Sequence, residues 1–151
     1  MTDNNLSKKI SIKVKSVITD LTDDKNDKET VEYSAEGSLN VKGGTIELVY
    51  RETEAMGLAN VETTLRFKQS RPTLINLVRR GDSGSSMIFD TEIPLRSCTY
   101  RLGSLPFSFF INTNSIVNNF SLTKGKIVLD YDIEIHGEKT EHTVFTLEYK
   151  A

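Results

Sequence analysis

The chain has 151 residues, which is enough for one domain, expected to span residues 1–151, that buries about two thirds of its unfolded surface. Its 19 basic and 21 acidic residues give a formal net charge of -2, and neither sign forms a long run. This balance argues against nucleic acid and against an anionic membrane surface, and we expect neither as a partner.

The chain has one cysteine, Cys98, which excludes an internal disulfide and fits a reducing compartment. The segment from Met1 to Ser7 is polar and lacks the apolar centre of a signal peptide. No apolar run approaches the roughly 20 residues of a membrane helix. We therefore expect a cytoplasmic protein. Cys98 alternates with Tyr100 and Leu102, so we expect a small buried residue there rather than a nucleophile.

Apolar and polar residues alternate along nearly the whole chain, which predicts strands with one buried face. The clearest case runs from Thr30 to Lys42, with Gly37 in its middle suiting a bend or a bulge. A short helical turn is plausible only after Thr113. In chain order, the expected strands lie near residues 10–14, 30–42, 45–53, 61–67, 73–80, 86–91, 95–102, 106–113, 127–135 and 143–149.

Turn residues separate these runs, and the three prolines stand at strand starts, where a missing backbone N–H is tolerated. Residues 136–140 predict a hairpin turn and residues 20–29 a solvated hairpin loop. Closure into a barrel protects the outer edges that such a series of strands would otherwise expose. We therefore predict an all-β fold, a closed antiparallel up-and-down β-barrel of eight to ten strands. The glycines expected in turns are Gly43, Gly44, Gly57, Gly81, Gly84, Gly103 and Gly125.

Three motifs that suggest chemistry have simpler interpretations. The segment from Gly81 to Ser85 resembles the nucleophile motif of chymotrypsin-like proteases, but both histidines follow it without a partner motif, so it indicates a glycine-rich loop. His136 and His142 could share zinc with Glu134 or Glu141, although the spacing is a weak signal. Residues 20–29 lack the spacing of a calcium loop. We predict no catalytic residue, no metal and no cofactor.

Polar residues on inward rows are more informative. Glu52 ends the apolar row that contains Tyr50, and a buried carboxylate needs a cation or hydrogen-bond donors. Arg79 and Arg80, at the end of a nearby strand, are the natural partners. The group is either a structural ion pair at the barrel mouth or a pair that recognises a ligand.

Several segments resemble the YwiB-like family of bacterial calycin-type β-barrels, a family of unknown function. The segments that carry the resemblance are Leu48 to Glu52, Gly57 with Val61 to Leu65, Arg79 to Gly81 leading to Met87 to Phe89, and then Tyr100, Gly103, Thr113, Gly125 and Tyr131. The resemblance implies a calycin or lipocalin-like barrel of eight or slightly more strands. It assigns no activity to any residue.

Three functions stay open. The first is binding of a small, partly apolar ligand inside the barrel. The second is a structural or protein-interaction module with a filled barrel, either alone or as a homodimer, because Phe107, Phe109 and Phe110 cannot all face inward on a regular strand. The third is an enzyme that uses Glu52 as a base. The candidate binding residues are Tyr50, Glu52, Arg79, Arg80, Tyr100, Thr113 and Tyr131.

Overall fold

The computed structural model describes residues 5–52, 61–81, 83–102 and 104–151, with the backbone only for Glu52, Ser83 and Leu102. The turn glycines Gly57 and Gly103, and Asp82 of the protease-like segment, lie outside this range. The described residues form ten β-strands and no helix. The strands are β1 (Leu6–Asp20), β2 (Lys28–Lys42), β3 (Thr45–Glu52), β4 (Val61–Lys68), β5 (Arg71–Arg80), β6 (Ser83–Asp90), β7 (Leu95–Leu102), β8 (Leu105–Asn119), β9 (Lys124–Ile135) and β10 (Glu138–Lys150).

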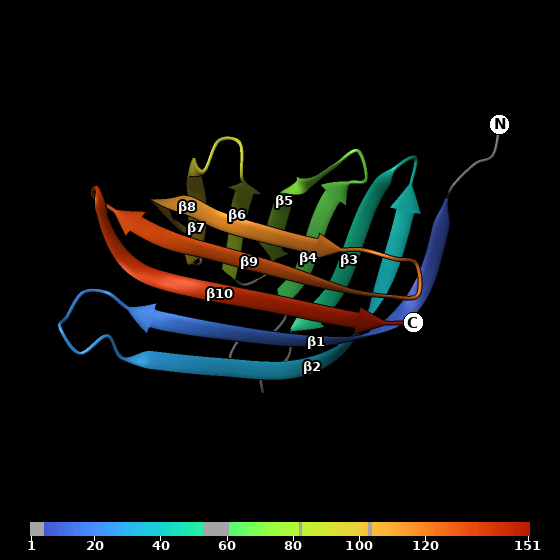
Figure 1. Ribbon diagram of the computed structural model, residues 1–151, viewed down its shortest axis with the longest axis horizontal. Helices are drawn as coiled ribbons and strands as arrows, with labels where there is room; N and C mark the ends of the chain where they lie inside the picture. The colour runs from blue at the N-terminus through green and yellow to red at the C-terminus, as the bar shows by residue number, and fades with distance from the viewer. Residues whose placement is uncertain (1–4, 53–60, 82, 103) are drawn as a thin grey trace.

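The strands close into one barrel. Each strand pairs antiparallel with its neighbours in the chain, and β1 also pairs with β10, so the predicted up-and-down barrel is confirmed. In Figure 1 the barrel is flattened into two layers, with β8, β9, β10, β1 and β2 running across the strands β3 to β7. No helix long and apolar enough to cross a membrane occurs in the part of the chain that the structure describes.

Alternate residues of all ten strands face a shared apolar interior. Side chains such as Leu39, Leu65 and Ile127 are fully buried there, and Cys98 is buried as expected. One end of the barrel, which we call the closed end, is plugged by aromatic rings: Phe67 of β4 meets Phe120 edge to face, with ring centroids 5.7 Å apart. The apolar interior accounts for the stability of the fold, since burial of apolar surface is its main favourable contribution.

The expected helical turn after Thr113 is wrong. Residues 114–119 continue β8, and the register with β9 shifts between Thr113 and Ser115, which makes Asn114 the extra residue of a β-bulge. A bulge moves the inward row from odd to even positions, so the alternation breaks although the strand does not. The interrupted alternation suggested that the strand ends at Thr113. The strand in fact continues, with its inward-facing positions shifted by one residue.

Gly37 lies at a close approach of two strands. It pairs with Ile10 on β1 and with Tyr50 on β3, and the register is regular at this point. A Cβ atom on Gly37 would lie 2.4 Å from the backbone oxygen of Val49. Only glycine therefore fits here, where β1 and β2 curve from one layer of the barrel toward the other (Figure 1).

Candidate functional site

The end of the barrel opposite the closed end, which we call the mouth, carries a polar row on its inner face. Five residues from β3 to β7 follow one another directly across the strand pairs. The inner row two residues deeper consists of Leu48, Leu65, Leu77, Met87 and Cys98, all buried. The interior thus changes from apolar to polar within one step along the strands. We call the five residues the mouth row: Tyr50, Thr63, Arg79, Ser85 and Tyr100.

Two hydroxyls of the mouth row are buried without a hydrogen-bond partner among the described residues. They are Thr63 Oγ1 and Ser85 Oγ, and their residues stand directly opposite Arg79 on its two sides. An unsatisfied buried hydroxyl costs about 1–3 kcal/mol. The Thr63 and Ser85 hydroxyls, which lie beside the Arg79 guanidinium, can therefore form hydrogen bonds with a bound molecule.

Tyr131 of β9 lies across the interior from Arg79. It packs edge to face on Phe89, with ring centroids 4.7 Å apart, and its strand partners are Thr113 and Thr143. Burial raises the pKa of the Tyr131 phenol, while the charge of Arg79 and a hydrogen bond with Thr143 act in the opposite direction. Arg79 shares a face of β5 with the buried Ile75 and Leu77, so its side chain is on the inner face.

A carboxylate stands at the same end. Glu141 is two residues before Thr143 on β10, which puts it on the inner face, and it is half-buried. Burial raises the pKa of Glu141, and the nearby carboxylates of Asp20 and Glu29 raise it further. The mouth therefore contains a cation, Arg79, and a carboxylate, Glu141, whose ionised form is disfavoured by burial and by neighbouring negative charges.

The inner face of β8 provides an apolar wall. Leu105, Phe107 and Phe109 share a face with the fully buried Ile111. The pairing of β8 with β9 reaches only Phe110, so the start of β8 projects beyond its neighbour. Phe107 is 49% exposed although it lies on the inward row. Apolar surface of this kind is left uncovered at the entrance to the interior.

The predicted binding residues fall into four groups. Tyr50, Arg79, Tyr100 and Tyr131 are on the inner face at the mouth. Arg80 is exposed on the opposite face of β5, and Glu62 is the residue directly across from it on β4. The Thr113 hydroxyl accepts a hydrogen bond from the backbone N–H of Asp90, at 3.2 Å, and so ties β8 to β6. Glu52 pairs through its backbone with Val61, and its side chain lies outside the described residues.

Sequence reasoning named none of four inner residues as a ligand-binding residue, although it considered Glu141 as a zinc ligand: Thr63, Ser85, Glu141 and Thr143. Thr63 and Thr143 lie on rows that the alternation predicts to face inward, so parity could have found them. Hydroxyl side chains are common in strands, however, and nothing in the sequence tells whether a hydroxyl has a partner. That depends on side chains from other strands.

A second polar cluster lies on the outer face around the bulge of β8. His142 Nδ1 is 2.7 Å from Asp132 Oδ1, and its Nε2 is 3.3 Å from Asp130 Oδ1. Burial alone would raise the pKa of Asp132, but hydrogen bonds from His142, Lys139 and Asn114 hold it below its usual value. The described residues contain no group of three or more histidine, cysteine, aspartate or glutamate side chains arranged to hold a metal.

Comparison with known proteins gives a family and a fold. The family described as domain of unknown function DUF1934 matches residues 12–147. The crystal structure of the ywiB protein from Bacillus subtilis superimposes with a TM-score of 0.80 at 23% identity, over 96% of this chain and 92% of that one. None of the curated proteins matches the chain. The likeness to the ywiB protein confirms the barrel.

Proposed function

Because the chain belongs to the DUF1934 family, whose function is unknown, we propose a function from its own geometry: the mouth binds a small, partly apolar molecule with an anionic end. Barrels of about this size are wide enough to hold one small ligand. Ligand sites are mostly apolar, with a few polar groups that fix orientation. The mouth row and the wall of β8 supply these two parts.

The observation that carries the proposal is the trio Thr63, Arg79 and Ser85. Two buried hydroxyls without partners among the described residues flank one inward guanidinium in register. Hydroxyls can donate to an anion, and a guanidinium adds charge-assisted hydrogen bonds. A carboxylate or phosphate placed between the three would satisfy both hydroxyls. We therefore assign the anionic end of the ligand to this trio.

The apolar part of the ligand fits the other side of the mouth. Phe107 and Leu105 are exposed on the inner face of β8, and Phe109 beside them is half-buried. Each fully covered CH₂ group of a ligand contributes about 0.8 kcal/mol. Glu141 stands at the same end and disfavours a second negative charge there, so the anion belongs at the trio and the tail at the entrance.

Calorimetric titration with decanoate, and with decanol as the uncharged counterpart, tests the proposal. We expect decanoate to bind and decanol to bind at least about tenfold more weakly, since a hydrogen bond to a charged group contributes about 1.5–3 kcal/mol. Thr63→Val and Ser85→Ala should each weaken decanoate binding by about tenfold.

Matched controls come from the adjacent positions that face the other side. Thr64→Val and Ser86→Ala remove the same groups from the outer face of β4 and β6 and should leave the affinity unchanged. Equal binding of decanol and decanoate, or equal losses in the outer controls, would contradict the assignment of the trio.

A second candidate is an interaction role on the outer face, as a homodimer. Phe110 is 44% exposed on the face of β8 opposite Phe109, and the exposed Leu95 of β7 is its diagonal neighbour. Sedimentation should then give a dimer that Phe110→Ser dissociates and Phe107→Ser does not. A strict monomer at all concentrations would remove this candidate.

A further inference from the structure

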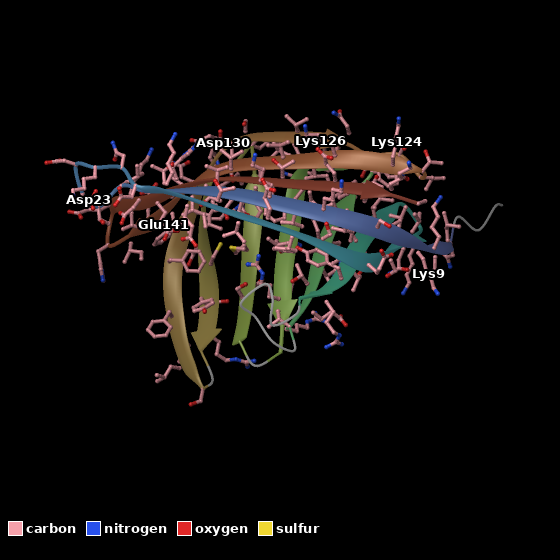
Figure 2. All side chains as sticks on the ribbon, turned by 90° about the horizontal axis from the view of Figure 1, so that it is seen from below. Lys9, Asp23, Lys124, Lys126, Asp130 and Glu141 are labelled. Carbon is pink, nitrogen blue, oxygen red and sulfur yellow. The ribbon has the colours of Figure 1, made fainter. Side chains whose placement is uncertain are left out.

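The closed end gathers lysines on the outer face of three neighbouring strands. Lys150 of β10 stands directly between Ser11 of β1 and Lys124 of β9, and in the next row Glu148 stands between Lys13 and Lys126. Figure 2 shows Lys124, Lys126 and Lys9 toward one end of the molecule and Asp23 and Glu141 toward the other. The near-neutral net charge of the chain therefore does not exclude a local excess of lysines at the closed end.

These side chains border a groove of about 830 Å³. We call it the lysine groove. Its size lies within the range of about 300–1,000 Å³ that is usual for small-molecule sites. The lining residues are Ser11, Lys13, Asn119, Phe120, Ser121, Lys124, Gly125, Lys126, Glu148, Tyr149 and Lys150.

The positive charge of the lysine groove is only partly balanced by the residues that the structure describes. Glu148 is the one carboxylate of the lining, and it lies 3.7 Å from Lys126 Nζ. Within the described ranges, Lys13, Lys124 and Lys150 have no ion pair. Lys124 and Lys150 face each other directly across β9 and β10, an arrangement that destabilises a sheet. Protection of a sheet edge does not explain them, because β10 is paired on both sides.

The loop that forms one side of the groove is held in place. The Tyr149 hydroxyl donates to the Ser121 carbonyl at 2.8 Å and accepts from the Ser121 N–H at 3.1 Å. The Lys124 N–H donates to Ser121 Oγ at 3.1 Å. A Cβ atom on Gly125 would lie 2.3 Å from the Tyr149 hydroxyl oxygen, so glycine is required for this ring position. The backbone carrying Lys124 is thus fixed before any ligand arrives.

We propose that the lysine groove binds a short chain of phosphates, such as inorganic triphosphate or the triphosphate of a nucleotide. A lysine ammonium group is a point charge on a flexible side chain, so it can bind a phosphate without requiring one fixed geometry. Neighbouring strands are about 4.8 Å apart, and alternate residues on a strand are about 6.7 Å apart. The four lysines of the groove are spaced accordingly, which suits an anion with several charges along its length. They are Lys13, Lys124, Lys126 and Lys150. This site is separate from the mouth and does not depend on the function proposed for it.

Two features favour a compact anion over a nucleic acid strand. Tyr149 is buried and Phe120 half-buried, so the groove offers no exposed ring for stacking a base. Carboxylates also bound it: Glu36 lies 3.4 Å from Ser11 Oγ, and Glu32 pairs with Lys15 at 3.6 Å. A long polyanion would meet these charges as soon as it left the groove.

Calorimetric titration at low salt with inorganic triphosphate, ATP, inorganic phosphate and a short single-stranded RNA tests the proposal. We expect triphosphate and ATP to bind alike and inorganic phosphate to bind at least about tenfold more weakly, because it reaches fewer lysines. Tighter binding of RNA than of triphosphate would overturn the compact-anion assignment. Much tighter binding of ATP than of triphosphate, or equal binding of inorganic phosphate, would overturn recognition of a phosphate chain.

Variants of opposite sign complete the test. Lys124→Gln and Lys150→Gln should each weaken triphosphate binding by up to about fivefold, and Glu148→Gln should strengthen it. Lys15→Gln, on the same strand as Lys13 but paired with Glu32 outside the groove, should change nothing. Because Lys124→Gln and Lys150→Gln each relieve the repulsion between these two lysines, the unfolding curves of these two variants should show no loss of stability. An unchanged affinity in all three groove variants would refute the site.

Discussion

The two ends of the barrel are built differently although the same strands form both. At the closed end, Phe67, Phe120 and Tyr149 pack against one another and hydrogen bonds fix the loop after β8. At the mouth, two hydroxyls of the same interior have no hydrogen-bond partner in the part of the chain that the structure describes, and a phenylalanine stays half-exposed. The contrast supports our proposal that one end stabilises the fold and the other binds a ligand, since binding sites commonly cost stability.

The largest test of this contrast removes one aromatic ring from each end. Phe67→Ala should lower the free energy of unfolding by about 3–5 kcal/mol, because the ring is 3% exposed and leaves a cavity. Phe107→Ala at the mouth should cost less than about 1 kcal/mol, since that ring is already half in water. Urea unfolding of both variants measures the difference. Similar losses at the two ends would break the comparison.

The second test concerns Asp90, which ties the β6–β7 connection together at the closed end. Its carboxylate is fully buried and lies 2.6 Å from Arg96 and 3.6 Å from Arg71. Burial alone would raise the pKa of Asp90, but hydrogen bonds from Arg96 and from the Glu92 and Ile93 N–H groups, and the charge of Arg71, hold it below its usual value. Asp90→Asn should cost about 2–3 kcal/mol at neutral pH.

The pH dependence of Asp90 follows from the direction of its shift. A lowered pKa in the folded state means that its stabilisation is complete above the unfolded value of 3.8 and is lost as pH falls through the folded value. The gap between wild type and Asp90→Asn should therefore close in acid. Glu92→Gln is the control: it removes a mostly exposed partner of the same Arg71, and should cost less than about 1 kcal/mol.

Alternation predicted most of the fold, although the first strand is longer than expected and Gly84 and Gly125, expected in turns, lie in β6 and β9. The failure after Thr113 has a local cause. The strand expected from Thr30 to Lys42 is β2, Lys28–Lys42, because a half-buried strand imposes its period on the sequence. The strand expected to end near Thr113 continues to Asn119, because the bulge at Asn114 shifts the pattern by one residue. A single inserted residue is enough to hide the second half of a strand.

The sites were harder to predict than the fold. Parity placed Tyr50 inward, but we proposed both Arg79 and Arg80 as partners of Glu52, and only Arg79 lies on the inner face. The absence of partners for Thr63 and Ser85 among the described residues depends on contacts between strands. The lysine groove unites positions near both ends of the chain, from Lys13 to Lys150. Only the pairing of β1 with β10 brings these lysines together, so no local run of charge in the sequence could predict the lysine groove.

A third test concerns Glu141, the mouth carboxylate whose ionised form is disfavoured. The pKa of Glu141 is raised in the folded state, so its ionisation costs stability as pH rises from the ordinary value of 4.5 through the folded value. Glu141→Gln should therefore stabilise the protein at neutral pH by less than the loss expected for Asp90→Asn. The gain should vanish below about pH 4, where both side chains are neutral. Glu138→Gln, exposed on the same strand, should give no such pH-dependent gain.

The most direct measurement is the unfolding free energy of Thr63→Val and Ser85→Ala without ligand. If the mouth keeps its hydroxyls for a ligand, each substitution removes a hydroxyl that has no partner among the described residues, and should raise stability by about 1 kcal/mol while weakening decanoate binding by about tenfold. If either variant is less stable than the wild type and still binds decanoate equally well, its hydroxyl serves the fold, and the division between the two ends of the barrel is wrong.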